Sequence, residues 1–279
     1  MESEWMPWAE RDAAAYVAVP TERDDKYSRG VLGIVTGSAE YPGAGVLGVE
    51  GAARTGLGMI RYLGDATKLV LSRRPEVVTL PGRVQAWLIG SGTDSGELGL
   101  LGTLFSDALA SDEPVVADGG ALEMAAEAPR AGVVVTPHYR ELARMLAHVG
   151  ERVSAQTIAT TPSVWASRAA DILRVTVLLK GSTTFIAEPL GARIAVSGAP
   201  GWTATAGAGD VLGGVLGALV ATHADGAFEP GTLARLAASA QVLHATAAQR
   251  ASQGGPIVAL DIAEALPDAV RQLLAIRGD

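Results

Sequence analysis

The sequence contains no cysteine, few aromatic residues and only three lysines among its 279 residues. The absence of cysteine excludes disulfide bonds, thiolate catalysis and the zinc sites that cysteine ligates, and it suits a reducing compartment. Acidic residues outnumber basic ones by 30 to 22, which gives a formal net charge of −8. Nucleic acids and anionic membranes bind clustered basic surfaces, so this composition argues against both as the main partner. Small-molecule chemistry is the better expectation.

Long apolar runs are also missing. The longest run of low charge, Val211–Thr222, is shorter than the roughly 20 residues that cross a bilayer, which predicts a buried helix and no transmembrane segment. The acidic first twelve residues do not resemble a secretory signal, so the cytoplasm is the expected location. A hydrophobic content of 48% is ample for a sizeable core. We expect one domain over residues 1–279, with residues 1–25 as an N-terminal extension.

Predicted strands and helices alternate along the chain. The strand-like runs show no consistent polar alternation, as expected when a sheet is covered on both faces. They are Val31–Thr36, Lys68–Leu71, Ala86–Ile89, Pro114–Ala117, Gly132–Thr136 and Val175–Leu179. Predicted helices between them are Ala44–Tyr62, Leu98–Ala110, Tyr139–His148 and Pro162–Leu173, followed by an antiparallel pair, Phe185–Ala187 with Arg193–Val196, and by helices Val211–Ala224, Pro230–Gln253 and Asp261–Ile276. This order predicts an α/β fold with a doubly wound, mostly parallel sheet flanked by helices and a helical C-terminal tail.

A glycine-rich turn stands before the first of these tail helices, in the segment 205–212. Gly207 and Gly209 allow positive φ and close backbone approach, so the N–H groups of Gly207, Ala208 and Gly209 can form an anion cradle at a helix N-terminus. Asp210 follows directly, and a carboxylate held against a substrate hydroxyl can accept its proton as the oxygen attacks phosphorus. The alternative is that Asp210 only caps a buried helix.

Other candidates follow predicted strands, where ligands of such sheets bind. Lys180 precedes Gly181, Ser182, Thr183 and Thr184, and this cation with its hydroxyls and N–H groups suits phosphate oxygens, although a solvated surface lysine gives the same pattern. His138 can orient a ligand or form the first turn of a helix. Asp118 can bind a metal-bridged phosphate or cap a turn. The small residues of segment 41–45 allow a substrate to approach the backbone, or serve helix packing.

Together these segments resemble the ADP/ATP-dependent NAD(P)H-hydrate dehydratases, whose fold belongs to the ribokinase-like group. The resemblance runs over most of the chain, and the Tyr-Pro-Gly-Ala and Thr-Pro-His segments are its most specific parts. The matching segments are 26–30, 35–38, 41–44, 52–58, 115–118, 136–138, 180–184 and 206–212. Two segments depart from the pattern. Many relatives carry Asp-Ala-Asp where this chain has Asp118-Gly119-Gly120, and Pro-Gly-Met-Ala where it has Pro200-Gly201-Trp202-Thr203.

The resemblance implies which residues contact each ligand. It places the hydrated nicotinamide near Ala44, Gly92, His138 and Asp210. It assigns the adenine nucleotide to Gly209 and to the segment Lys180, Gly181, Ser182, Thr183 and Thr184. A magnesium ion is expected to bridge the nucleotide phosphates, with no protein ligand named for it. Family members also suggest a homotetramer, although buried core helices explain the same apolar tail.

The resulting hypothesis is a lyase that restores NADH and NADPH from their hydrates, NADHX and NADPHX. Phosphorylation of the ring hydroxyl, with Asp210 as the base, would convert hydroxide into phosphate, a better leaving group. ADP is the expected donor, although no residue separates ADP from ATP. Because residues 1–25 are too few for an epimerase domain, a separate epimerase is the expected partner for the other epimer. The alternatives are a vitamin or sugar kinase with the same turn and a nucleotide-binding protein without catalysis.

Overall fold

The computed structural model describes residues 5–94 and 98–278, and a single nine-stranded sheet runs through the part that it describes. The strand order is β1-β9-β8-β7-β6-β5-β4-β2-β3. Neighbours from β3 to β7 pair in parallel, β8 pairs antiparallel with β7 and β9, and β1 pairs parallel with β9. The strands are β1 Met6–Pro7, β2 Val31–Val35, β3 Met59–Tyr62, β4 Ala86–Ile89, β5 Val115–Ala117, β6 Val133–Val135, β7 Thr176–Leu179, β8 Thr184–Ala187 and β9 Arg193–Val196.

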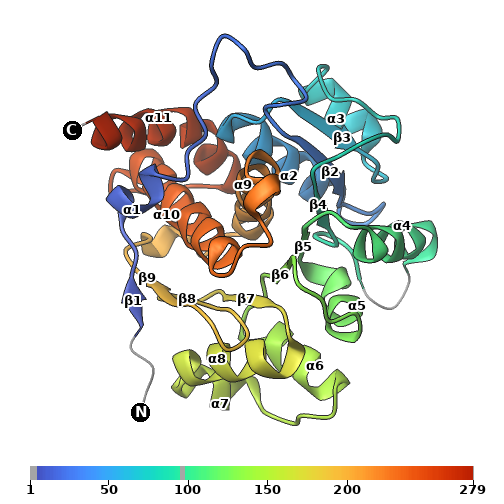
Figure 1. Cartoon of the computed structure of the whole chain (residues 1–279), viewed down its shortest axis with the longest axis vertical. Coiled ribbons are helices and arrows are strands. Elements are labelled where there is room, and N and C mark those ends of the chain that lie inside the picture. The colour runs from blue at the N-terminus through green and yellow to red at the C-terminus, as the bar shows by residue number, and fades with distance from the viewer. Residues whose placement is uncertain (1–4, 95–97, 279) are drawn as a thin grey trace.

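Helices cover both faces of this sheet (Figure 1). The α-helices are α1 Glu10–Ala14, α2 Pro42–Thr55, α3 Thr67–Arg73, α4 Gly99–Ala110, α5 Leu122–Glu127, α6 Tyr139–His148, α7 Ala155–Thr160, α8 Pro162–Leu173, α9 Ala208–Thr222, α10 Thr232–Ser252 and α11 Ala259–Gly278. Short 3₁₀ turns are η1 Gly119–Ala121, η2 Gly201–Thr203 and η3 Ala224–Gly226. The doubly wound, mostly parallel sheet and the helical C-terminal tail predicted from the sequence are confirmed.

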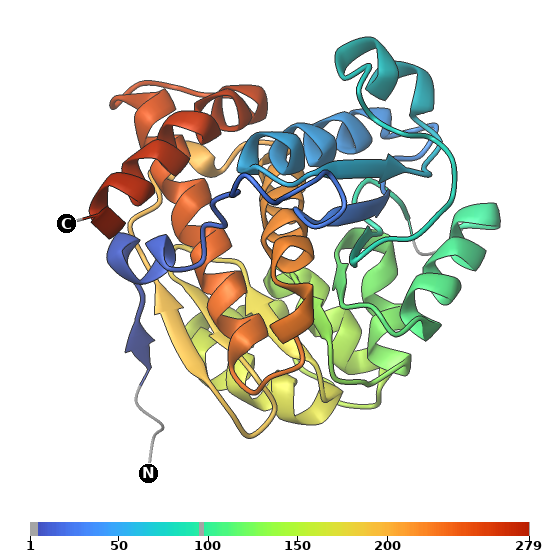
Figure 2. The ribbon, with the colours of Figure 1, turned by 45° about the horizontal axis from the view of Figure 1, so that its top comes forward.

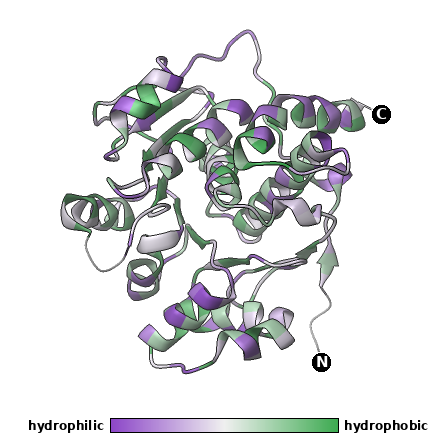
Figure 3. Cartoon of the chain, turned by 180° about the vertical axis from the view of Figure 1, so that it is seen from behind, coloured by the Kyte–Doolittle hydropathy of each residue, from purple (hydrophilic) through white to green (hydrophobic). Residues whose placement is uncertain are grey.

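Two hydrophobic cores lie on opposite faces of the sheet. Successive strand residues point to opposite faces, and in β6 Val134 belongs to one core while Val133 and Val135 belong to the other. The first core joins the sheet to α1, α2, α9, α10 and α11, and the second joins it to helices between α4 and α8. Green, hydrophobic strands run through the centre of the molecule in Figure 3. The lack of polar alternation in the sequence therefore reflects burial on both sides.

The N-terminal segment belongs to this architecture instead of trailing from it. Strand β1 extends the sheet beyond β9, and Ala13 and Ala14 of α1 are buried. Figure 2 shows α1 beside α10 and α11, and Glu10 accepts hydrogen bonds there from Thr246 and Gln272. The expected extension, residues 1–25, is thus structured over much of its length, while residues 1–4 lie outside the described part.

Two sequence predictions about secondary structure are wrong. The sequence predicts a strand over Lys68–Leu71, but these residues lie within α3, where only Val70 is buried. It also predicts one helix over Ala44–Tyr62, but α2 ends at Thr55 and β3 begins at Met59. Gly56 adopts a left-handed φ of 111° between them, which is the common way for a helix to stop.

Helices α2 and α9 pack closely because glycines face the contact. A Cβ on Gly51 would collide with the carbonyl oxygen of Val211, and one on Gly214 would collide with that of Gly48. This close approach brings the N-terminal ends of both helices to the same edge of the sheet. Helix packing through glycine is therefore one use of the small residues of α2.

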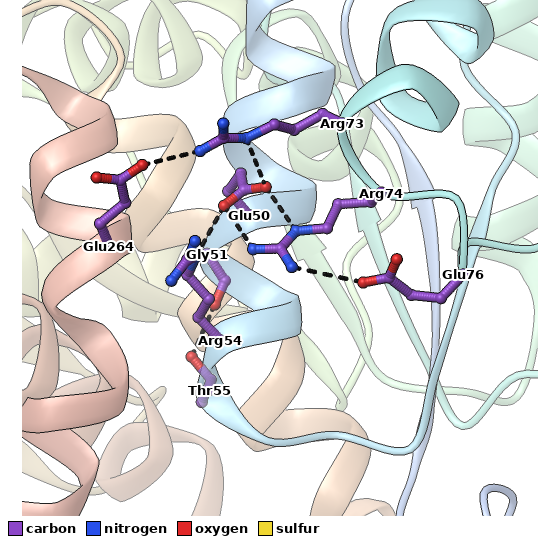
Figure 4. Close-up of polar contacts among 8 residues, drawn as sticks. All are labelled: Glu50, Gly51, Arg54, Thr55, Arg73, Arg74, Glu76 and Glu264. Atoms are coloured by element: carbon purple, nitrogen blue, oxygen red, sulfur yellow. Dashed lines mark hydrogen bonds and ion pairs between the residues drawn. The ribbon is translucent and has the colours of Figure 1, made fainter.

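A buried carboxylate joins α2 to its neighbours (Figure 4). Glu50 is fully buried and pairs with Arg54, Arg73 and Arg74, the closest atoms being 2.6 Å apart. Arg73 also reaches Glu264 of α11 at 2.9 Å. Burial raises the pKa of Glu50, but the hydrogen bonds and charges of Arg74 and Arg54 outweigh it and hold the pKa below its ordinary value. The network fixes α2, α3 and α11 relative to one another.

None of the described helices is long and apolar enough to cross a membrane.

Candidate active site

The glycine-rich turn forms the N-terminus of α9 at the carboxyl ends of the parallel strands. Gly207 is the N-cap residue, with φ of 88°, and Asp210 lies in the first helical turn. A side chain on Gly207 would collide with Leu47 of α2, so only glycine suits this position. Gly209 is helical and does not use its freedom of φ. The first N–H groups of a helix have no partner within it. In α9 the Ala208 N–H donates to the carbonyl oxygen of Thr205 at 3.4 Å, and the remaining N–H groups of the turn are able to bind an anion.

Asp210 is held by a serine from another strand end. Its Oδ1 accepts a hydrogen bond from the Ser91 hydroxyl, which follows β4. Asp210 is not the N-cap residue and makes no capping hydrogen bond, so the alternative that it merely caps a helix is wrong. The carboxylate is instead fixed by a tertiary contact at the edge of the sheet.

Lys180 lies next to the same turn. Its Nζ is 3.6 Å from the place where a Cβ on Gly209 would stand, and it donates to Asp118 Oδ1 at 3.0 Å. The backbone N–H of Lys180 donates to the carbonyl oxygen of Pro137, which anchors the residue to the chain after β6. The lysine is therefore part-buried in an ionic site, and the alternative of a solvated surface lysine is wrong.

Acidic groups surround this lysine. Thr136 Oγ1 donates to Asp118 Oδ1 at 2.8 Å, and Asp118 makes no capping hydrogen bond to the turn after it. Glu141 Oε2 lies 3.8 Å from Lys180 Nζ. A Cβ on Gly120 would stand 2.9 Å from the carbonyl oxygen of Thr93, which leaves little room for the second acid of the family pattern. Glu141 supplies a further carboxylate near Lys180 from a different segment.

Burial and these charges shift the ionisation of both key groups. Burial lowers the pKa of Lys180, but Asp118, Glu141 and Asp210 outweigh it, so the pKa lies above its ordinary value and the lysine is a cation. For Asp210, burial raises the pKa, the Ser91 hydrogen bond lowers it, and the net shift is upward. A carboxylate with a raised pKa is a stronger base than an ordinary aspartate.

The segment after Lys180 is the turn between β7 and β8. Gly181 and Ser182 are exposed, and Thr183 Oγ1 lies 3.1 Å from Ser197 Oγ in the strand-end segment beside it. Thr184 is the first residue of β8, pairs with Val196 and is buried. Its hydroxyl therefore does not belong to the exposed turn that the sequence suggested.

The expected substrate-binding residues lie at the same edge. Ala44, at the start of α2, packs against Gly92, which has φ of 68° and no room for a side chain beside the Ala44 methyl group. His138 is the N-cap of α6: its Nδ1 accepts from the N–H groups of Arg140 and Glu141, both at 3.2 Å. The imidazole thus performs the structural role that the sequence left open, and its side chain is half-exposed beside Lys180.

A hollow of about 630 Å³ opens beside the turn after β4, and neither Asp210 nor Lys180 lines it. The residues that line it come from the segments after β2, β3 and β4, and they are Ser38, Ala39, Glu40, Asp65, Thr93, Asp94 and residues 98–101. Among the described residues, no three histidine, aspartate or glutamate side chains are arranged to hold a metal ion. The described side chains thus offer no cage of three such ligands for a magnesium ion.

The sequence pattern did not predict two residues of this site, Ser91 and Glu141. Ser91 lies in the turn after β4, directly before Gly92, but its bond to Asp210 spans 119 residues and has no local signal. Glu141 does have a local signal, because it follows the N-cap residue His138 by three positions, which is the spacing of a capping box. Its carboxylate accepts from the His138 N–H at 2.7 Å.

Known proteins resemble this chain in sequence and fold. The family model described as NAD(P)H-hydrate dehydratase matches residues 32–268. A bifunctional NAD(P)H-hydrate repair enzyme of Mycobacterium tuberculosis is 43% identical over 224 residues, 76% of this chain and 45% of that protein. The chain thus spans about half the length of such relatives. An ADP-dependent (S)-NAD(P)H-hydrate dehydratase of Neisseria meningitidis is 32% identical over 72% of each chain.

Solved structures show the same fold. The ADP/ATP-dependent NAD(P)H-hydrate dehydratase of Bacillus subtilis, co-crystallised with ATP and Mg²⁺, gives a TM-score of 0.81 at 24% identity, covering 97% of this chain and 99% of that one. A ribokinase-like superfamily protein of Enterococcus faecalis gives 0.81 at 20% identity, covering 98% of both. The fold is therefore ribokinase-like. With a family model that matches most of its length, the chain belongs to the NAD(P)H-hydrate dehydratase family.

Proposed function

We propose that the protein dehydrates NADHX and NADPHX to NADH and NADPH, with ADP or ATP as phosphoryl donor. The observation that supports this most is the convergence of Asp210, Lys180 and the N-terminus of α9 at one edge of the sheet. This set supplies a base, a cation and an anion cradle, which phosphoryl transfer to an alcohol requires. The names of relatives, including an ADP-dependent dehydratase, support the same substrates.

The proposed first step is phosphorylation of the ring hydroxyl. Asp210 accepts the hydroxyl proton as the oxygen bonds to the terminal phosphorus, and the bond from that phosphorus to the bridging oxygen of the nucleotide breaks. Lys180 and the N–H groups of residues 207–209 stabilise the charge on the transferred group. A magnesium ion bound to the nucleotide phosphates would neutralise further charge.

The proposed second step eliminates phosphate. The lone pair of the ring nitrogen expels inorganic phosphate and the neighbouring carbon loses a proton, which restores the ring double bond of NADH. Ala44, Gly92 and His138 are proposed to line the nicotinamide side. The nucleotide side is proposed to comprise Lys180, Gly181, Ser182, Thr183 and Gly209, without the buried Thr184. Three expectations stay predictions: a cytoplasmic location, a homotetramer, and a separate epimerase that supplies the usable epimer.

One assay tests the function. Purified protein is incubated with NADHX and magnesium in two parallel reactions, one with ADP and one with ATP. We expect absorbance of reduced nicotinamide to return, together with one phosphate and one AMP per NADH when ADP is the donor. Accumulation of a stable phosphate ester from a vitamin or sugar, with no recovery of NADH, would instead show a kinase.

A further inference from the structure

A half-exposed tryptophan stands in the segment that leads to the glycine-rich turn. Trp202 lies in η2 and is 49% exposed, whereas each of the other four tryptophans is more buried. Its indole Nε1–H donates to the carbonyl oxygen of Gly254 at 3.2 Å. This N–H is the only polar group of the ring, so the part of the ring that meets solvent is apolar. Trp202 therefore presents an anchored aromatic surface to solvent.

The segment 197–207, which contains Trp202, joins two parts of the proposed nucleotide side. At one end, Ser197 Oγ lies 3.1 Å from Thr183 Oγ1 in the turn between β7 and β8. At the other end, Gly207 is the N-cap of α9. Trp202 is the middle residue of this segment, five positions from either end, so a fully extended chain would place it at most about 18 Å from each. The indole thus stands beside the proposed nucleotide site.

The end of α10 and the residues after it hold this segment in place. Gln249 of α10 donates to the carbonyl oxygen of Gly198 at 2.6 Å, and the bond from Trp202 to Gly254 adds a second tie five residues further along the chain. The position of the indole is therefore fixed by the fold. A ring that is held in place before a ligand arrives loses little conformational freedom on binding.

The strand order sets the direction in which a bound nucleotide extends. Asp210 bonds to Ser91, which follows β4, whereas Thr183 and Ser197 stand at the ends of β7, β8 and β9. Strands β5 and β6 separate these two groups in the sheet. Because the attacking and leaving oxygens of a transferred phosphoryl group lie roughly in line, a substrate hydroxyl beside Asp210 requires the rest of the donor to lie on the opposite side. That side carries the segment 197–207.

We propose that Trp202 binds the base of the adenine nucleotide by stacking against it with its exposed ring surface. The inference rests on the proposed function for its ligand. Stacking on an aromatic side chain adds affinity for any flat base and needs neither charge nor hydrogen bond. Lys180 and the turn before α9 hold the phosphates, and Trp202 holds the other end of the molecule. A purine offers a larger face than a pyrimidine, so this residue favours ADP over CDP.

A tryptophan that only ties the segment to Gly254 would behave differently on substitution. Its removal would loosen the glycine-rich turn and weaken every ligand of that turn, whether or not the ligand carries a base. Loss of stacking weakens only ligands that have a base. Inorganic pyrophosphate keeps the two phosphates of ADP and lacks the ribose and adenine, so it separates the two roles.

The experiment compares the unsubstituted protein with Trp202→Ala and with Trp202→Phe, which keeps an aromatic ring. Phe228→Ala is the matched control, because Phe228 is also 49% exposed but packs against Gly132, before β6, at the opposite edge of the sheet. For each purified protein we would measure thermal unfolding and, by calorimetry with magnesium present, the dissociation constants for ADP, CDP and inorganic pyrophosphate. Tryptophan fluorescence would be followed as ADP or pyrophosphate is added.

In Trp202→Ala we expect the dissociation constant for ADP to rise about tenfold, because the stacked base is lost, while that for pyrophosphate stays unchanged. The preference for ADP over CDP should shrink. Trp202→Phe should keep most of the affinity, and Phe228→Ala should bind as the unsubstituted protein does. In the unsubstituted protein, ADP should quench tryptophan fluorescence and pyrophosphate should not. This quenching should disappear in Trp202→Phe, which retains the other four tryptophans.

Unchanged ADP affinity in Trp202→Ala would overturn the proposal. So would equal losses for ADP and pyrophosphate, because Trp202 would then support the turn instead of touching the base. If Trp202→Ala failed to fold, a lack of ADP-specific quenching in the unsubstituted protein would still decide against stacking. The proposed function can fail separately: a protein that showed base-dependent binding through Trp202 but left NADHX unchanged would keep the stacking role and lose the dehydratase role.

Discussion

Ser91 donates its hydroxyl hydrogen bond to Asp210 and so joins the turn after β4 to the first turn of α9. One segment follows β4 in the parallel sheet and the other begins the C-terminal helices, yet the buried Ser91 and the partly buried Asp210 meet at the same edge. The bond occupies Oδ1 of the carboxylate and leaves Oδ2 for a substrate proton. Orientation of the proposed base is therefore a property of the fold and not of the local sequence around Asp210.

Removal of the Ser91 hydroxyl should change the pH dependence of turnover. The hydrogen bond lowers the pKa of Asp210 against burial, so Ser91→Ala should raise that pKa further. The acidic limb of kcat/KM should then move to higher pH, because Asp210 must be ionised to act as a base. Ser91→Thr keeps the hydroxyl and serves as the control. An unmoved acidic limb would argue that Ser91 does not tune Asp210.

Substitution of Asp210 itself should separate chemistry from binding. Asp210→Asn removes the proton acceptor but keeps the size of the side chain, and kcat should fall by about 10²–10⁴. ADP affinity should be kept or improved, because one negative charge beside the phosphate is lost. Single-turnover kinetics and calorimetry with ADP measure the two effects. A variant with full turnover would refute the proposed base.

Lys180 should matter for nucleotide affinity. Lys180→Met leaves Asp118 and Glu141 without their cation, so these carboxylates repel an incoming phosphate. We expect the dissociation constant for ADP to rise about tenfold or more. Lys68→Met, at an exposed position on α3, is the matched control. Equal ADP binding by both variants would remove Lys180 from the nucleotide site.

The buried ion network should be essential for stability. Glu50→Gln leaves three arginines around a neutral group, and we expect the free energy of unfolding to drop by about 3–5 kcal/mol. Glu264→Gln, at the exposed rim of the same network, should cost less than about 1 kcal/mol. Urea unfolding at neutral pH measures both. Similar small losses would show that the arginines find other partners.

Mild acid should destabilise the protein partly through His244, which is buried in α10. In the unfolded chain this histidine takes up a proton near its ordinary pKa of 6.5, whereas burial lowers the pKa to about 4 in the folded state. The unfolded state thus binds more protons between these values, and stability should fall as pH drops through this window. His244→Leu should flatten the slope. An identical slope in both proteins would contradict the assignment of that titration to His244.

The mostly parallel sheet, and the edge at which the candidate residues gather, could be predicted from the sequence because β-branched runs end in glycine, aspartate, histidine or lysine. The order of the strands could not. The local residue pattern gave wrong secondary structure where tertiary packing determines the conformation. Lys68–Leu71 is a short apolar run that reads as a strand, but α3 buries only Val70 on the outside of α2. Gly56, in contrast, was a readable signal for the end of α2.

The polar partners within the site depend on contacts far apart in sequence. Thr136 with Asp118, Lys180 with Glu141 and Ser91 with Asp210 each join different strand ends. The sequence indicated that such residues gather at one edge, but not which atoms meet.

The glycine contacts between α2 and α9 also fix the distance between the axes of these two helices. Ala44 and Asp210 stand on the ends of these two helices, so the gap between the proposed substrate and phosphate sides is determined one or two turns below, where Gly48, Gly51 and Gly214 bring the axes together. A single methyl group added to Gly51 or Gly214 would push the two helices apart. Substitutions at this helix contact should therefore alter which substrates fit the proposed site, although the substituted residues do not touch the ligand.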